Sequence, residues 1–235
     1  MDYTMGVDIG GTFTDFSLIN AEGKILLWKE ASTPKNPAEA IKRGLEAMSA
    51  QQDLQLSEFL GRLDLFVHGQ TIATNTVIQR NGPKTALLCT EGFRDIIHFR
   101  DGFKPERYNI QLQPPSDFIP RYLRLSVKER VNYAGEIQIE LDENSVLGVV
   151  EVLKKECVQS VAVSFLWSIM NPSHERRVKE ILSEHLPDLP VVLSSDVLPM
   201  IREWERTTCT VLSAYVLPGI GKYMVDLENF LHLFN

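Results

Sequence analysis

Hydrophobic and polar residues alternate over the first thirty positions in the way expected of short strands. Residues 5–9 are apolar enough to form a buried strand that runs into Gly10 and Gly11. Residues 13–19 and 24–30 predict two further strands joined by a turn rich in Asn and Gly. A helix is expected next, because Pro37 suits a first helical position and four apolar residues share one face. These four are Ala38, Ile41, Leu45 and Met48.

The middle of the chain predicts one more strand and helix before the pattern becomes irregular. Alternating apolar residues over 63–67 indicate a strand that ends at His68, and residues 71–79 indicate a helix. Residues 85–89 read as a strand. Residues 99–124 are rich in Pro and Arg, which favours a long excursion over the surface. Residues 126–141 follow as an expected hairpin.

The last ninety residues alternate helix and strand, and this pattern decides the fold class. Helices are predicted over 146–153 and from Asn171, and strands over 161–166 and 190–193. Residues 202–234 read as largely helical, with a break near Pro218. Such alternation predicts an α/β layer structure with a mixed sheet. The sequence shows no linker that clearly divides two independent domains.

Composition and charge narrow the function classes. The 235 residues carry 24 Lys and Arg against 31 Asp and Glu, a formal net charge of −7. This acidic balance argues against a nucleic-acid or anionic-membrane binder, since both partners attract basic faces. No apolar run approaches the roughly 18 residues of a membrane span. Three widely spaced cysteines predict neither a disulfide framework nor a metal site, so a cytoplasmic location is expected.

The segment GVDIGGTFTD, residues 6–15, is the strongest chemical signal in the chain. Glycines let backbone N–H groups approach phosphate oxygens, and threonine hydroxyls can donate to the same oxygens. Two carboxylates flank the glycines and could hold Mg²⁺ together with phosphate. The segment matches neither the dinucleotide fingerprint nor a Walker A loop, because more strand follows it. The alternative is a glycine-rich hairpin capped by threonines.

Four further groups of residues have both a functional and a structural interpretation. His68 lies at the carboxyl end of a predicted strand, where ligands gather, or it is hydrogen-bonded into the turn. Thr71 and Asn75 lie one helical turn apart and either contact substrate or cap the helix. His174 and Glu175 are interpreted as a helix cap, and Arg121, Arg124, Lys128 and Arg130 as a solvated or partner-binding basic patch.

These motifs resemble a known family. Residues 6–15 are similar to the first phosphate motif of the actin, hexokinase and heat-shock ATPase superfamily. More narrowly, HGQTIATNTVIQRNGPKTALLCTEGFRDII (68–97), NPSHE (171–175) and REWERTT (202–208) resemble the hydantoinase A, 5-oxoprolinase and acetone or acetophenone carboxylase family. Gln70 stands where the family usually has Thr or Ser.

The resemblance implies an RNase H-like α/β half of the actin and hexokinase type, with a mixed sheet, flanking helices and a surface insertion. It implies an N-terminal domain over residues 1–200, with the insertion at about 99–135, and a helical start of a further region over 201–235. Family members are several hundred residues longer, and their second phosphate motif has no counterpart here.

The resemblance also implies ATP and Mg²⁺ as cofactors and chemistry on amide or ketone carbonyls. The first hypothesis is part of a hydrolase of cyclic amides, the second a ketone carboxylase subunit, and the third a non-catalytic fragment or assembly module. The implied catalytic residues are Asp8 and His68, the metal ligands Asp8 and Asp15, and the substrate residues Thr71 and Asn75. Phosphate would be bound by Gly10, Gly11, Thr12, Thr14 and Asp15.

The implied partners are a hydantoinase B-like subunit, the missing C-terminal half and a small cyclic amide or ketone, with no nucleic acid and no membrane. On this view the isolated chain is inactive, because one phosphate turn cannot enclose a nucleotide or exclude water. Self-association is also expected, because the missing half would leave apolar surface open along the last helical stretch. The residues expected there are Val211, Leu212, Tyr215, Val216, Leu227, Leu231 and Phe234.

Overall fold

The computed structural model describes residues 2–33, 36–102, 106–113 and 115–232. The chain folds as two compact units. Unit 1 comprises residues 1–79 and 219–235, and unit 2 comprises residues 80–218. These divisions fall elsewhere than the boundary expected after residue 200, and they occur where the sequence shows no evident linker.

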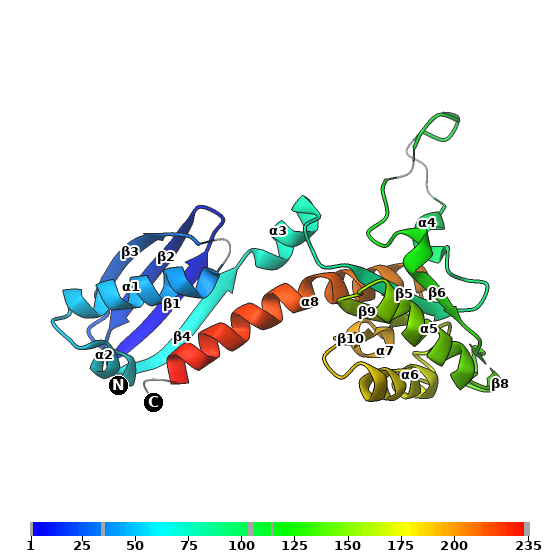
Figure 1. Cartoon of the computed structure of the whole chain (residues 1–235). Helices are drawn as coiled ribbons and strands as arrows, with labels where there is room; N and C mark the ends of the chain where they lie inside the picture. The colour runs from blue at the N-terminus through cyan, green and yellow to red at the C-terminus, as the bar shows by residue number, and fades with distance from the viewer. Residues whose placement is uncertain (1, 34–35, 103–105, 114, 233–235) are drawn as a thin grey trace. The chain divides into compact units, whose positions relative to one another are not determined.

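Unit 1 is built on a four-stranded mixed sheet (Figure 1). Its strands are β1 (Tyr3–Ile9), β2 (Phe13–Asn20), β3 (Ile25–Ala31) and β4 (Leu63–Gln70), in the order β3-β2-β1-β4. β2 is antiparallel to β1 and β3, whereas β4 runs parallel to β1. This arrangement confirms the mixed sheet and the RNase H-like half that the resemblance implied.

One face of this sheet is covered by α1 (Pro37–Gln51) and α2 (Leu56–Gly61). α1 begins at Pro37 as predicted, and its buried residues include Ile41, Leu45 and Met48. They pack on the inward residues of the strands, among them Met5 and Phe16. The unit's core is therefore the layer between α1 and the sheet.

The other face of the sheet is open in the part of the chain that the structure describes. Leu27 is 72% exposed and Leu65 54%, and Ile25 and Val67 lie on the same face. Of the residues expected at the surface, Val211, Tyr215 and Leu227 are buried instead. Leu212, Val216 and Leu231 are half-buried, and Phe234 lies outside the described residues. The exposed apolar residues thus lie on a sheet face rather than on the C-terminal helix.

α8 (Glu203–His232) runs through Pro218 without the predicted break. Proline removes one helical hydrogen bond but does not force an end when the flanking turns are held by packing. Val211 and Ala214 belong to the core of unit 2, and Tyr223 and Leu227 belong to the core of unit 1. The boundary between the units falls directly after Pro218, so the sequence signal there marks a unit boundary within a continuous helix.

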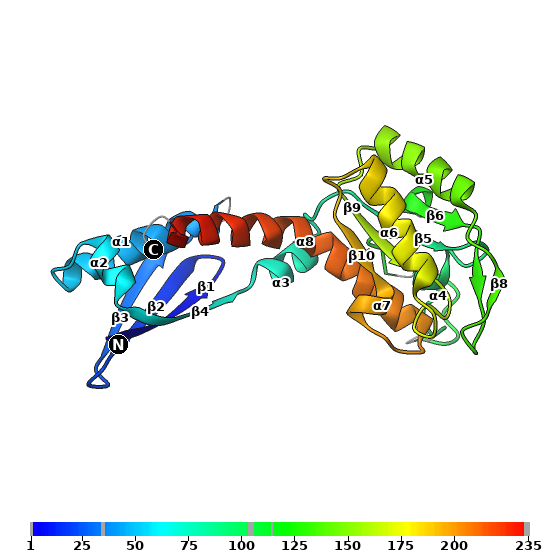
Figure 2. The ribbon, with the colours of Figure 1, turned by 90° about the horizontal axis from the view of Figure 1, so that it is seen from below.

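Unit 2 contains a second sheet, in which every strand is parallel to its neighbour. Its order is β10-β9-β5-β6. The two central strands, β5 and β9, are fully buried. Figure 2 shows α5 and α6 beside each other against this sheet. The bounds are β5 (Thr85–Thr90), β6 (Arg124–Val127), β9 (Ser160–Ser164), β10 (Val191–Leu193), α5 (Glu143–Lys155) and α6 (Ser173–His185).

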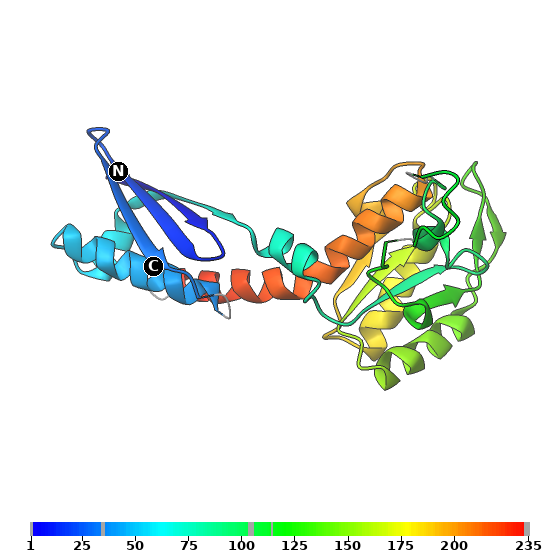
Figure 3. The ribbon, with the colours of Figure 1, turned by 90° about the horizontal axis from the view of Figure 1, so that it is seen from above.

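The remaining elements are short. They are α3 (Ile72–Gln79), α4 (Ile96–Phe99), the 3₁₀ helix η1 (Arg121–Leu123), α7 (Ser194–Val197), and the hairpin of β7 (Arg130–Val131) and β8 (Ile137–Ile139). The hairpin confirms part of the expected 126–141 hairpin. Figure 3 shows the ribbon of Figure 1 seen from above.

The expected surface insertion over 99–135 is only partly an excursion. Residues 124–127 form β6, which pairs with β5 inside the sheet of unit 2. Arg124 was assigned to a solvated basic patch, but its side chain is 3% exposed. It bonds to the carboxylates of Asp95 and Asp117 and donates to the Ile119 carbonyl. Arg124 therefore ties the irregular segment to the core.

His174 and Glu175 are core groups rather than a surface helix cap. Glu175 is fully buried and accepts hydrogen bonds from the backbone N–H groups of Phe165 and Ser195. His174 Nδ1 lies 2.9 Å from Glu129 Oε2. The buried Glu175 carboxylate is tolerated because hydrogen-bond donors surround it. Its bond to Phe165 joins α6 to the residues after β9.

No helix in the described ranges is both long and apolar enough to span a membrane.

Gly44 is required by the close approach of α1 to β2. A Cβ at this position would lie 2.1 Å from Phe16 Cζ. We expect Gly44→Ala to destabilise unit 1 by about 1–3 kcal/mol, because the buried ring has no room to move. Urea unfolding followed by circular dichroism measures this change.

The matched control is Gly221→Ala, in the part of α8 that belongs to unit 1. A Cβ there meets nothing within 4 Å. This variant should be neutral or more stable by up to about 1 kcal/mol, since alanine favours helix. Equal effects of the two substitutions would show that helix propensity, and not packing on Phe16, decides the outcome.

Candidate functional site

The turn between β1 and β2 has the backbone geometry of a tight hairpin. Gly10 N donates to Phe13 O at 3.0 Å, and a Cβ on Gly10 would lie 2.9 Å from that same oxygen. Only glycine therefore fits at position 10. Gly11 and Thr12 are exposed at the tip, where a ligand can reach their backbone N–H groups.

Ser32, directly after β3, holds this turn in place and was not identified from the sequence. Its hydroxyl donates to Gly10 O at 2.8 Å, and its N–H donates to Thr12 O at 2.9 Å. Thr14 Oγ1 lies 3.0 Å from the same hydroxyl. Two carbonyls of the turn are thereby turned toward Ser32, which leaves the N–H groups at the tip for a ligand. The sequence has no motif that identifies Ser32, because its role depends on the pairing of β3 with β2.

Asp8 and Asp15 are directly opposite each other on β1 and β2. Both are exposed, and the alternation along the strands places both on the open face of the sheet. Lys29 Nζ, on the neighbouring strand β3, lies 2.9 Å from Asp15 Oδ1. A Cβ added to Gly69 of β4 would be 3.3 Å from Asp8 Oδ1, so the absence of a side chain there keeps Asp8 accessible.

The start of α3 lies beside the turn. Thr71 donates to Ile9 O from both its N–H and its hydroxyl, at 3.3 Å each. Asn75 Nδ2 donates to Thr71 Oγ1 at 3.1 Å and would lie 3.9 Å from a Cβ added to Gly11. Thr71 and Asn75 are thus brought to the turn, as their predicted role requires, although Thr71 also performs the alternative structural role.

Gln70 performs the capping that a hydroxyl residue would otherwise provide. Its Oε1 accepts a hydrogen bond from Ile72 N at 2.6 Å, at the beginning of α3. The departure from the usual Thr or Ser therefore preserves the start of the helix.

His68 does not join this group. It is on β4 opposite Val7, and Val7 faces the core, whereas Asp8 faces the open side. Its Nδ1 lies 3.3 Å from the Tyr223 hydroxyl, and the two rings meet edge to face. Burial raises the pKa of Tyr223 to about 12, so the hydroxyl keeps its proton and can donate to His68.

The arrangement suits a phosphate with a hard cation. Mg²⁺ takes one or two carboxylates and completes its shell with phosphate oxygens and water. Asp8 and Asp15 supply such a pair beside the exposed tip of the turn. No group of three or more His, Cys, Asp or Glu able to hold a metal occurs among the described residues, so these residues alone do not form a complete protein cage.

A comparison with known families identifies the family of the chain. The profile of the hydantoinase/oxoprolinase N-terminal region matches residues 4–186. The chain therefore belongs to the hydantoinase/oxoprolinase N-terminal family.

The relatives include subunits of a caprolactamase and of a carboxylase. The chain is 38% identical over 228 residues to caprolactamase subunit alpha of Pseudomonas jessenii, covering 96% of this chain and 33% of the relative. It is 37% identical over 226 residues to the acetophenone carboxylase gamma subunit of Aromatoleum aromaticum, covering 91% and 31%. The chain spans about a third of the length of these relatives.

Solved structures match nearly the whole chain. The ATP-dependent caprolactamase of Pseudomonas jessenii superposes with a TM-score of 0.89 at 36% identity, over 99% of this chain and 34% of that one. Nucleotide-free acetone carboxylase superposes with a TM-score of 0.87 at 28% identity, over 99% and 35%. The fold of both units is thus one that occurs in these enzymes.

Ser32→Ala should loosen the turn without removing any group that we assign to ligand binding. The carbonyl of Gly10 would lose its donor, so unit 1 should lose about 1–2 kcal/mol of stability. The amide protons of residues 10–12 should exchange faster, which hydrogen exchange with mass spectrometry can measure.

Ser17→Ala is the control for this variant. Ser17 lies on β2 and donates to Gly6 O at a longer distance of 3.4 Å, away from the tip. Its loss should leave exchange at residues 10–12 unchanged. Equal protection of the turn in Ser32→Ala and the wild type would remove Ser32 from the support of the turn.

Proposed function

We propose that this chain forms the phosphate-binding part of an ATP-dependent enzyme that activates a carbonyl oxygen, with cyclic amides as the substrate class. The observation that carries the proposal is the exposed carboxylate pair of Asp8 and Asp15 beside the glycine turn. Membership of the family and the ATP dependence of the caprolactamase relative support it.

The residues of the turn divide into those that contact the phosphates and those that shape the turn. The N–H groups of Gly11 and Thr12 and the Thr12 hydroxyl would bind phosphate oxygens at the exposed tip. Thr14 is fully buried and bonded to Ser32, so it would support the turn instead. Asp8 and Asp15 would hold Mg²⁺, which supplies positive charge to phosphate oxygens when it is bound.

Transfer of phosphate to the oxygen of an amide makes the carbonyl carbon easier to attack, because phosphate is a good leaving group. The contribution of this chain would be position and charge, as is usual in phosphoryl transfer. Asp8 is the residue best placed to orient Mg²⁺ and an attacking water, since Gly69 leaves its carboxylate accessible.

Thr71 and Asn75 would contact the substrate or the terminal phosphate from the beginning of α3. His68 would have a structural role. It joins β4 to α8 on the covered face of the sheet, where it cannot reach a ligand held by Asp8 without passing through the sheet. We therefore assign it to the support of unit 1 and not to the reacting atoms.

A ketone carboxylase is the second candidate. It is favoured by the acetophenone carboxylase relative, whose identity to this chain nearly equals that of caprolactamase. Both reactions would use the same activated oxygen, so the turn described here serves either one. A test of product, hydrolysed amide or carboxylated ketone, decides between them.

Three of the relatives are named as alpha, beta and gamma subunits, so these relatives belong to enzymes of several subunits. We propose a hydantoinase B-like partner for this chain, and we propose that protein equivalent to the other two thirds of the relatives completes the ATP site. On this proposal the chain on its own shows no steady ATP hydrolysis.

Asp8→Asn should abolish nucleotide turnover in the assembled enzyme while leaving the fold intact. The amide has the shape of the carboxylate but lacks the charge that would hold Mg²⁺, so the rate should fall by roughly a hundredfold or more. Phosphate release with a cyclic amide present measures the effect, and the need for Mg²⁺ should rise in parallel.

Asp64→Asn is the matched control, because Asp64 is an exposed carboxylate on β4 away from the turn. It should turn over ATP as the wild type does. Turnover by Asp8→Asn at the wild-type rate would overturn the proposed role of the carboxylate pair.

A further inference from the structure

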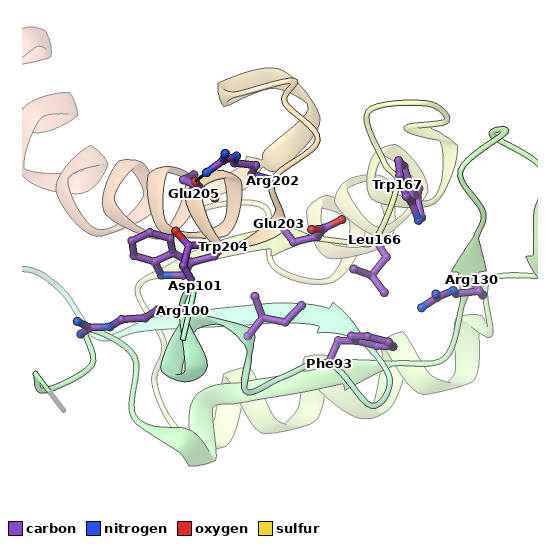
Figure 4. Close-up of a pocket in the computed structure, with 11 residues that line it drawn as sticks. Phe93, Arg100, Asp101, Arg130, Leu166, Trp167, Arg202, Glu203, Trp204 and Glu205 are labelled. Atoms are coloured by element: carbon purple, nitrogen blue, oxygen red, sulfur yellow. Dashed lines mark hydrogen bonds and ion pairs between the residues drawn. The ribbon is translucent and has the colours of Figure 1, made fainter. Parts of the chain in front are cut away.

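A hollow of about 480 Å³ in unit 2 has the size of a small-molecule site (Figure 4). All of its lining residues lie within unit 2, and none belongs to the glycine turn. It is formed by the segment after β5, the strand β7, the residues that follow β9 and the first turn of α8. The proposed function therefore does not use it.

The lining combines apolar and aromatic side chains. Phe93, Ile96 and Leu166 supply apolar surface to the lining. Trp167 and Trp204 also line the hollow, and Figure 4 shows them on different sides of Leu166. Apolar and aromatic surface of this kind is typical of pockets that bind the hydrocarbon part of a ligand.

Trp167 adopts a backbone conformation that a bulky residue rarely takes, with φ at +58°. Such a conformation costs about 1–2 kcal/mol and needs support from its surroundings. The Trp167 ring meets Tyr133 edge to face at 6.5 Å, which helps to hold it beside the hollow. The fold thus keeps an indole at this position at a cost in stability.

Two charged residues of opposite sign face the hollow without ion-pair partners in the described part of the chain. The Arg130 guanidinium lies 4.9 Å from the centre of the Phe93 ring, and no carboxylate of the described ranges pairs with it. Glu203, in the first turn of α8, likewise forms no ion pair with any residue that the structure describes. Figure 4 shows the two side chains pointing into the hollow from different sides, with Leu166 drawn between them.

The other charged residues of the lining either have partners or are exposed to water. Arg202 Nη1 lies 3.1 Å from Glu205 Oε1, and Arg100 Nη2 donates to Pro115 O at 3.3 Å. Asp101 is exposed at the rim, where water solvates it. Glu203 also interacts electrostatically with the buried Arg206 guanidinium. Arg130 and Glu203 are both half-buried, and neither forms an ion pair within the described ranges, so both side chains can still bond to a ligand.

We infer that this hollow binds a zwitterionic amino acid whose carboxylate and ammonium are separated by an apolar chain. Arg130 receives the carboxylate, Glu203 receives the ammonium, and the methylenes of the ligand lie on Leu166 and Phe93. A ligand with both charges suits the site because each half-buried side chain then gains a charge-assisted hydrogen bond.

Ring opening of a cyclic amide yields a molecule of this class, with one new carboxylate and one new amine. That connection rests on the proposed function, and it would make the hollow a site where product is sensed or held. Binding itself does not rest on it. A protein that fails to turn over ATP can still bind the zwitterion, so the two proposals fail separately.

Calorimetric titration of the purified protein with 6-aminohexanoate tests the inference, with hexanoate and hexylamine as probes that each lack one charge. We expect saturable binding of the zwitterion, and roughly tenfold or weaker binding of each singly charged probe. Equal affinity for hexanoate and 6-aminohexanoate would overturn the role of Glu203, and the absence of saturable binding at millimolar concentrations would overturn the site.

Substitutions in and outside the hollow test whether 6-aminohexanoate binds there. Arg130→Gln and Glu203→Gln should each weaken 6-aminohexanoate binding by roughly tenfold or more. Lys179→Gln on α6 and Asp188→Asn remove the same charges from exposed positions outside the hollow and should bind as the wild type does. Thermal unfolding of each variant checks the fold. Wild-type binding by both hollow variants would place the ligand elsewhere and refute the inference.

Discussion

The alternation of side chains along β1 is the constraint on which the architecture of unit 1 depends. Met5, Val7 and Ile9 must face the core, so Asp8 between them must face the other side. Residues of β2 and β4 face the same side of the sheet as the residues of β1 with which they pair. It brings Asp15 to the side of Asp8 and sends His68 to the covered face. Which polar residues can share one ligand is therefore decided by the packing of three apolar neighbours.

The elements closest to a single sequence signal could be predicted well. The glycine turn, the start of α1 at Pro37 and the helix that ends before Asn81 all follow from local preferences. The separate parallel sheet of unit 2 could not be predicted, because the pairing of β5 with β6 and β9 joins residues far apart in sequence. Arg124 shows the same difficulty, since its burial depends on Asp95 and Asp117 from other segments.

The candidate site was predictable in part for a similar reason. Asp8, Gly10, Gly11, Thr12 and Asp15 lie within one motif, and their residue types suggest phosphate and Mg²⁺ directly. Ser32 was missed because a serine after a strand carries no signal until β3 is paired with β2. The sequence places His68 at the carboxyl end of a predicted strand, where ligands gather, and the resemblance implies a catalytic role for it with Asp8. A position at the end of a strand does not decide whether the His68 side chain faces the open or the covered side of the sheet.

The insertion of unit 2 into unit 1 has a consequence for how the chain acquires its structure. The residues of α8 that complete the core of unit 1, Tyr223 and Leu227, are synthesised only after all of unit 2. The core of unit 1 therefore cannot be completed until residues 80–218 have left the ribosome. Unit 2 is continuous in sequence and can collapse first. The unit that bears the phosphate turn would then be the later one to mature, because its core joins Met5 to Leu227 across the whole of unit 2.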